Sequence, residues 1–69
     1  MPLSARNQLK GTVKSVKMGT VMAEVVIDIG GQELVSAITA GSAEKLSLTE
    51  GKEVTAIIKA TEILVGTET

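Results

Sequence analysis

The sequence predicts an all-β fold, a small five-stranded barrel of the OB type with one short helix between its third and fourth strands. Three observations support this prediction. Apolar and polar residues alternate along several short stretches, turn-forming glycines separate these stretches, and one segment near the middle loses the alternation and begins like a helix. A different small five-stranded barrel stays open, because the same alternation would arise in either one.

The first predicted strand changes parity halfway along, which predicts a β-bulge near Ser15. Bulges of this kind help a sheet to curl into a barrel. The apolar positions of this strand are Leu9, Gly11 and Val13 before the bulge, and Val16 and Met18 after it.

The second predicted strand has the clearest alternation in the chain, with Glu24 and Asp28 on its polar face. Gly30 and Gly31 both tolerate positive φ, so they predict a tight two-residue hairpin, after which residues 32–38 return as the third strand. The apolar face of the second strand is formed by Val21, Ala23, Val25, Ile27 and Ile29.

The segment after the third strand breaks the period of two, and Ser42 is the expected N-cap of a helical turn. Lys45 stands where a capping box would have Glu or Gln, so the helix should be short. The residues expected to pack behind the cap are Ala43, Leu46 and Leu48.

The last third of the chain is expected to complete the barrel with two more strands. A turn around Gly51 leads into the fourth strand, which should end near Lys59. A corner at Ala60 and Thr61 then leads into a final short strand.

Composition limits how such a fold can be stabilised. The 69 residues suffice for one domain over residues 1–69, and a domain near this size buries only about 60% of its unfolded surface. The chain has no Cys, no His and no aromatic residue, so it lacks disulfides, the commonest metal ligands and large rings for its core. Because 43% of the residues are hydrophobic, we expect an obligate homo-oligomer that buries the excess apolar surface between subunits.

The residue types also limit the classes of function. Without His or Cys, a nucleophile would need a Ser–Lys pair or a carboxylate dyad, and the acidic residues are scattered, so we expect no enzyme. The formal net charge of −1 and the absence of aromatic stacking residues disfavour nucleic acid and anionic membranes as partners. The start of the chain has no leader pattern and no segment is long enough to span a bilayer, so we expect a cytoplasmic protein.

Three short segments carry hydrogen-bond donors suited to an oxyanion. Ser4 and Arg6 lie near the start, Thr39 and Ser42 flank the predicted helix start, and Lys59 ends a strand. A tetrahedral dianion needs donors from several directions and cationic compensation. Each of these residues also has an ordinary structural role as a cap, a turn residue or a solvated strand end, so the residues alone indicate an anion site without establishing one.

At SARNQLKGTV, AITAGSAEKLSLTEG and IKATEILVG, the chain resembles the molbindin family. These small Mop proteins bind molybdate or tungstate, and related modules occur in molybdate-responsive regulators and molybdate transporter ATPases. The resemblance extends from Ser4 to Gly66. It implies an OB-fold subunit that assembles into a homohexamer, a trimer of dimers, with oxyanions held at subunit interfaces for intracellular storage or homeostasis.

Position by position, the resemblance implies one oxyanion site shared between neighbouring subunits, with molybdate or tungstate as the ligand and neither a cofactor nor a directly coordinated metal ion. Its residues are Ser4, Ala5 and Arg6 of one subunit, facing Thr39, Ser42, Lys59 and Ala60 of a neighbour, with Ala5 and Ala60 donating backbone N–H groups. Many relatives have Ser where this chain has Ala60, which removes one side-chain hydrogen bond. A second kind of site, where three subunits meet, is implied at Gly19, Thr20 and Val21.

Two other functions stay open at this point. A nucleic-acid-binding OB module would bind an oligonucleotide with strong salt dependence. A purely structural oligomerisation domain would show no rise in melting temperature with any oxyanion.

Overall fold

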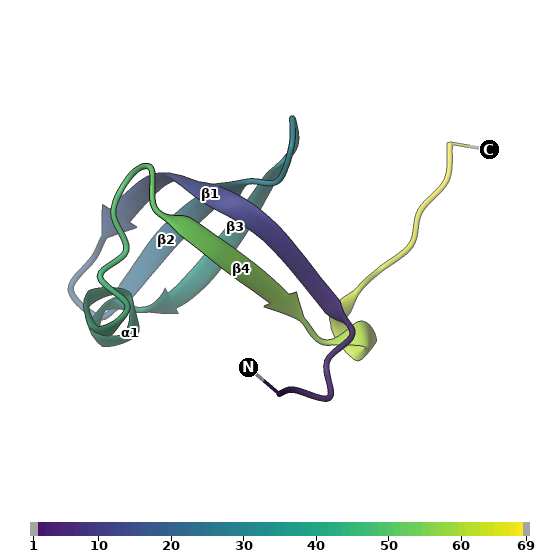
Figure 1. Cartoon of the computed structure of the whole chain (residues 1–69), viewed down its shortest axis with the longest axis horizontal. Coiled ribbons are helices and arrows are strands. Elements are labelled where there is room, and N and C mark those ends of the chain that lie inside the picture. Colours follow the sequence, from purple (N-terminus) through teal and green to yellow (C-terminus); the bar gives the residue numbers. More distant parts are fainter. Residues whose placement is uncertain (1, 69) are drawn as a thin grey trace.

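The computed structural model describes residues 2–68 and forms a curled antiparallel sheet with one short helix (Figure 1). None of the helices in this part of the chain has the length and apolar character needed to cross a membrane. The elements in chain order are β1 (Asn7–Met18), β2 (Met22–Asp28), β3 (Glu33–Thr39), α1 (Ala40–Lys45), β4 (Glu53–Ile58) and the 3-10 turn η1 (Ala60–Glu62).

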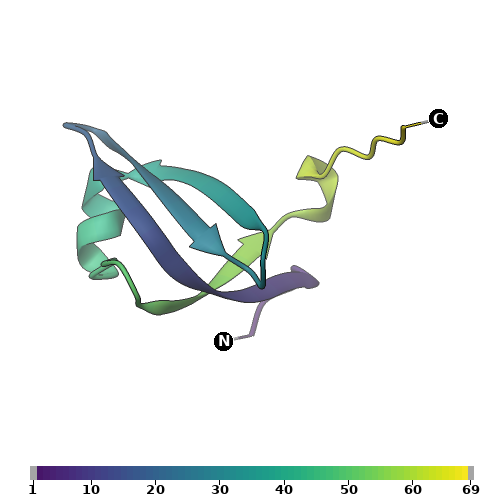
Figure 2. The ribbon, with the colours of Figure 1, turned by 90° about the horizontal axis from the view of Figure 1, so that it is seen from above.

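The sheet has the strand order β3-β2-β1-β4, and the long strand β1 connects its two halves. The first half of β1 pairs with β4 and the second half pairs with β2, and Figure 2 shows β1 bending across the molecule. The register of β1 against β2 shifts between Val13 and Ser15, which confirms the bulge predicted near Ser15. The extra residue brings both Val13 and Val16 to the inner face.

The core is small and entirely aliphatic. It consists of Val13, Val25 and Ile27, with partly buried residues packed around them. Gly11 is required beside this core, because a Cβ there would lie 2.6 Å from Ile27 Cγ2 and 2.7 Å from the Asp28 carbonyl oxygen. The partly buried residues are Val16, Ile29, Leu34, Ile38, Leu48, Val54 and Ala56.

The predicted two-residue hairpin at Gly30 and Gly31 is confirmed. Both residues have positive φ, at 96° and 98°, and the Ile29 amide donates to the Gln32 carbonyl oxygen at 2.8 Å. Asp28 Oδ1 accepts from the amides of both glycines at 3.0 Å, and these two hydrogen bonds hold the pKa of the Asp28 carboxyl below its ordinary value.

The helix is short, as predicted, but its cap is Thr39 and not Ser42. Thr39 has extended backbone dihedrals, and its Oγ1 accepts from the Ser42 amide. Both residue types are good N-caps, so the choice depends on where β3 ends, which the local sequence does not show. Leu46 is 58% exposed and does not pack behind the cap as expected, whereas Ala43 is buried and Leu48 reaches the core.

The predicted fifth strand is wrong, and the sheet has four strands. After η1 the chain runs away from the sheet in an extended path (Figure 1), and residues 63–68 form no strand in the part of the chain that the structure describes. Leu64 and Val65 are 95% and 90% exposed. The alternation that predicted a strand is present, but no strand of the same chain lies alongside to pair with it.

The isolated chain exposes more surface than a compact protein of its mass. Its accessible surface is 5605 Å² for 7.1 kDa, whereas a folded monomer of this mass typically exposes roughly 4,100 Å². The open edges of β3 and β4 and the extended C-terminal residues fit this excess.

Candidate functional site

The N-terminal arm, residues 4–6, leads directly into β1. Ser4 and Arg6 are exposed and Ala5 is half-buried. The Ala5 carbonyl oxygen accepts from Gln8 Nε2 at 2.8 Å, and Asn7 Nδ2 donates to the Ile58 carbonyl oxygen at 3.3 Å. These hydrogen bonds fix the base of the arm against the end of β4.

Lys59 and Ala60 leave the sheet beside this arm, because Asn7 is the register partner of Ile58. Lys59 is the N-cap residue of η1, and its carbonyl oxygen accepts from the Glu62 amide at 2.9 Å. Neither Arg6 nor Lys59 forms an ion pair or a side-chain hydrogen bond with any residue of 2–68. Two cationic side chains are therefore available for a ligand at this end of the sheet.

Thr39 and Ser42 form a pair of hydroxyls at the start of α1. The Ser42 amide donates to Thr39 Oγ1 at 3.1 Å, and the Thr39 hydroxyl donates to Ser42 Oγ at 2.7 Å. Both side chains are exposed. Since the Thr39 proton is used within the pair, the Ser42 hydroxyl is free to donate outward.

The two groups of candidate residues lie at opposite ends of the sheet. Strand β3 runs in the same direction as β1 and ends near the C-terminal end of β1. Strand β4 runs antiparallel to β1 and ends beside the N-terminal end of β1. Figures 1 and 2 agree in placing α1 far from η1 and the N-terminal arm. Within one chain, Lys59 and Ala60 are thus grouped with the arm, although the resemblance implied that they share a subunit's contribution with Thr39 and Ser42.

The turn at Gly19, Thr20 and Val21 lies beside the hydroxyl pair. The Gly19 amide donates to the Met22 carbonyl oxygen at 2.8 Å, and a Cβ on Gly19 would lie 2.6 Å from that oxygen. The Val21 carbonyl oxygen accepts from the Ala40 amide at 2.7 Å, which connects the turn to the start of α1. Val21 is 71% exposed, so its expected place on the buried face is wrong; β2 begins one residue later.

One further residue lies at this corner and was not among the predicted site residues. Met22 is the register partner of Thr39 in the β2–β3 ladder, and it is 47% exposed. The hairpin contains the signal for this pair: a two-residue turn at Gly30 and Gly31 pairs Asp28 with Glu33, and counting outward along both strands reaches Met22 and Thr39.

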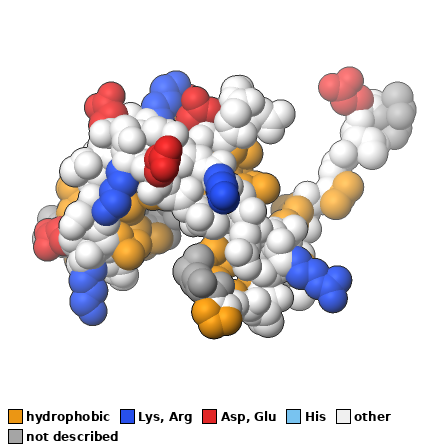
Figure 3. Space-filling view, in the orientation of Figure 1, with side chains coloured by type: hydrophobic (Ala, Val, Ile, Leu, Met, Phe, Trp, Pro, Cys, Tyr) orange, Lys and Arg blue, Asp and Glu red, His pale blue; other side chains and the backbone are white. Residues whose placement is uncertain are grey.

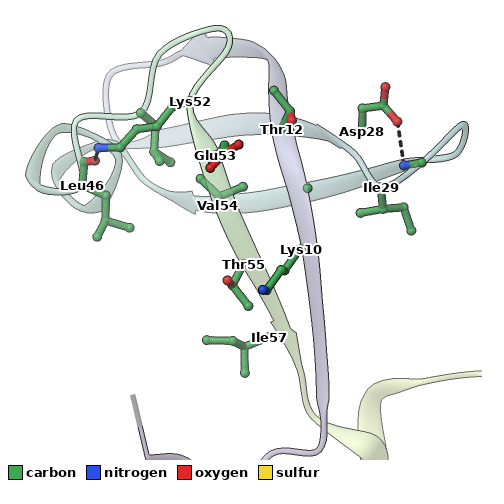
Figure 4. Close-up of a pocket in the computed structure, with 13 residues that line it drawn as sticks. Lys10, Thr12, Asp28, Ile29, Leu46, Lys52, Glu53, Val54, Thr55 and Ile57 are labelled. Atoms are coloured by element: carbon green, nitrogen blue, oxygen red, sulfur yellow. Dashed lines mark hydrogen bonds between the residues drawn. The ribbon is translucent and has the colours of Figure 1, made fainter.

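A groove of about 980 Å³ beside β1 and β4 does not contain the candidate residues. Figure 4 shows Lys10, Thr55 and Ile57 along β1 and β4, with Asp28 at one side of the groove. On the other side, Lys52 Nζ donates a hydrogen bond to the Leu46 carbonyl oxygen at 2.6 Å. The two lysines of this groove are accompanied by Asp28 and Glu53, so it has no net attraction for an anion.

A second groove, of about 760 Å³, separates the free edges of β3 and β4. Its apolar lining includes Leu34, Ile38 and Val54, and Lys59 with Glu62 also lines it. The groove lies where the missing fifth strand would have closed the barrel.

The surface charges follow no single sign. Figure 3 shows positive and negative side chains interspersed on the face it presents. Across residues 2–68 there is no group of three or more acidic side chains placed to hold a metal ion.

Known proteins resemble this chain over nearly its whole length. The model of the TOBE domain matches residues 3–65. Molybdenum-pterin-binding protein 3 of Clostridium pasteurianum is 52% identical over 66 residues, covering 94% of this chain and 97% of that protein. These proteins are named for binding, not for catalysis.

Two solved structures have the same fold. A molybdate-binding protein from Sporomusa ovata has a TM-score of 0.92 and 51% identity, covering 97% of this chain and all of that one. The cytoplasmic molybdate-binding protein ModG, in a form with molybdate bound, has a TM-score of 0.84 and 51% identity, covering 87% of this chain and 43% of that one. This chain is therefore a TOBE-domain protein and belongs to the molbindin (Mop) family.

Proposed function

We propose that this protein binds molybdate or tungstate reversibly, without a covalent or catalytic step. The observation that carries the proposal is the full-length similarity, near 50% identity, to proteins that are named for binding molybdenum-pterin or molybdate. The availability of Arg6, Lys59 and the Ser42 hydroxyl supports it, because each can donate to an anion without first losing another partner among residues 2–68.

The chemistry of the candidate residues suits a tetrahedral dianion. The ligand is held by the hydroxyls of Ser4 and Ser42, the latter oriented by Thr39, by backbone N–H groups at Ala5 and Ala60, and by the cations of Arg6 and Lys59. Such a shell contains only donors, so it recognises an acceptor-only oxyanion and forms no metal–protein bond. Two cations offset the two negative charges that leave water.

We further propose that the site forms between copies of the chain. The arm with Lys59 lies far from the hydroxyl pair, so one chain brings only part of the shell to any one place. The excess exposed surface and the apolar C-terminal residues Leu64 and Val65 support an oligomer. In this arrangement residues 63–66 of a neighbour pair with the free edges of β3 and β4 and fill the groove between them.

The assembly proposed is a hexamer made of three dimers, which the resemblance implies. The turn at Gly19, Thr20 and Val21 forms a second site where three chains meet. Its exposed position beside α1 supports this placement. Intracellular storage or homeostasis of the oxyanion is the role proposed, and the description of ModG as cytoplasmic supports a cytoplasmic location.

The test is thermal unfolding of the full chain at fixed protein concentration, with molybdate, tungstate, sulfate and phosphate added separately at matched ionic strength. A ligand at 100 times its Kd stabilises the folded state by about 2.7 kcal/mol, so a clear rise with molybdate and tungstate is expected. No rise with any oxyanion would overturn the proposal in favour of a structural oligomer, or of a nucleic-acid module if an oligonucleotide then binds with strong salt dependence.

Assembly is tested separately by the mass in solution. Sedimentation of the full chain should give a hexamer, and a chain shortened to residue 62 should give smaller species. A full chain that stays monomeric at micromolar concentration would contradict the shared site.

A further inference from the structure

We infer that Met22 is a specificity-determining residue of the proposed oxyanion site. Its thioether side chain forms an apolar wall beside the Thr39 hydroxyl and makes the site prefer large, weakly hydrated tetrahedral oxyanions to sulfate and phosphate. The inference rests on the proposed function, since it concerns how that site chooses among oxyanions.

The register of the sheet places Met22 beside the candidate donors. Met22 and Thr39 are the last pair of the β2–β3 ladder. Side chains directly opposite each other in an antiparallel pair lie on one face, with Cβ atoms about 4.5–5.5 Å apart. Thr39 in turn contacts Ser42 Oγ at 2.7 Å. Met22 and the two hydroxyl residues therefore lie at one corner of the sheet.

Packing within the chain does not explain why a large apolar residue stands at position 22. The side chain is 47% exposed and lies on the outer face, because its neighbour Ala23 points to the buried face. Its backbone carbonyl accepts from the Gly19 amide and its register partner is Thr39, so the turn and the ladder fix the backbone from which the side chain leaves the sheet. A large, flexible apolar group is thus held next to two polar groups at the surface.

The chemistry of a thioether gives this position its effect. Methionine has no N–H or O–H to donate, so it cannot replace the water that an anion loses on entering the site. The cost of removing an ion from water rises as the ion becomes smaller at constant charge. Sulfate and phosphate are smaller than molybdate, so loss of hydration beside an apolar side chain costs them more free energy. The preference therefore comes partly from the hydrogen bonds that the thioether cannot donate.

The experiment compares the ratio of the sulfate Kd to the molybdate Kd, measured by titration calorimetry on the full-length assembled protein. Met22→Ser, which adds a donor, should lower this ratio by about three- to tenfold. Met22→Leu should keep the ratio, because leucine is also apolar. Met22→Thr suits a strand and gives the same readout as serine if Met22→Ser does not fold.

Met18 provides a matched control. It has the same 47% exposure as Met22, but its register partner is Ala23, so it lies on the other face of the sheet. Met18→Ser should leave the ratio unchanged. An unchanged ratio in both polar Met22 variants, or an equal fall in Met18→Ser, would overturn the inference while leaving molybdate binding intact. Failure of the wild-type protein to bind molybdate would instead overturn the proposed function and this inference together.

Discussion

Thr39 and Ser42 hold each other through two hydrogen bonds that run in opposite directions. The Ser42 amide donates to Thr39 Oγ1, and the Thr39 hydroxyl donates to Ser42 Oγ. Thr39 therefore caps α1 and orients its neighbour, while the Ser42 hydroxyl proton points to whatever lies outside the pair. The two residues should respond differently to substitution.

Ser42→Ala should weaken molybdate binding by about 1.5–3 kcal/mol, the range for a hydrogen bond to a charged group. The melting temperature without ligand should change little, because the Ser42 amide still reaches Thr39. Thr39→Val is the contrasting variant, since loss of the cap costs about 0.5–2 kcal/mol of stability before any ligand is added. Equal losses of ligand-free stability in both variants would contradict this division of roles.

Arg6→Ala should weaken molybdate binding by about 1.5–3 kcal/mol without lowering the stability of the ligand-free chain. The reason is that Arg6 is exposed and has no ion pair with residues 2–68. Lys10→Ala removes a cation from β1 outside the candidate site and serves as the control. Titration calorimetry of both variants tests this prediction, and wild-type affinity in Arg6→Ala would exclude Arg6 from the site.

Gly11→Ala should destabilise the fold by about 1–3 kcal/mol, because the new methyl group meets Ile27 Cγ2 and a backbone oxygen of Asp28. Gly41→Ala is the matched control. Apart from the adjoining residues and the backbone of α1, no atom lies within 4 Å of its new Cβ, and it stands inside α1, where Ala is better than Gly by about 0.5–1 kcal/mol. Chemical denaturation should move the midpoints of the two variants in opposite directions, and a shared direction would refute the packing argument.

Asp28→Asn should lower stability at neutral pH, and the difference from wild type should shrink in acid. The amides of Gly31 and Gly30 lower the folded-state pKa of Asp28, so the unfolded chain binds the proton more readily. The carboxylate's contribution is complete above the unfolded pKa of about 3.9 and is lost as the pH falls through the lower folded pKa. Melting temperatures between pH 7 and pH 2.5 test this, with Glu50→Gln as an exposed control carboxylate. A constant difference across that range would contradict it.

The alternation of residues was sufficient to predict the parts of the fold that depend on local geometry. The parity change before Val16 located the bulge, and the two glycines after Ile29 located the hairpin, because both are encoded in neighbouring residues. The helix cap was assigned three residues too late, since Thr39 and Ser42 are both favourable N-caps and the end of β3 determines which of them caps the helix.

The prediction of a final strand was wrong for a different reason. Ile63, Leu64 and Val65 have the composition of a strand, but a strand forms only where another strand offers free backbone groups, and η1 turns these residues away from their own sheet. The arrangement of the candidate site likewise depends on contacts between distant parts of the chain. Residue types and the family resemblance indicated the donors, yet the grouping of Lys59 with Arg6, and not with Thr39, follows from strand directions that no short motif contains.

The two free edges of the sheet have a consequence for the newly made chain. An unpaired strand edge accepts any extended peptide, including one from an unfolded copy. Strands β3 and β4 both present such edges, and the exposed apolar C-terminal residues are a ready partner for them. The yield of folded protein during rapid synthesis should then depend on how fast the correct neighbours meet. Coexpression with a chaperone that covers strand edges should raise this yield most at high expression levels, where mispairing competes with assembly.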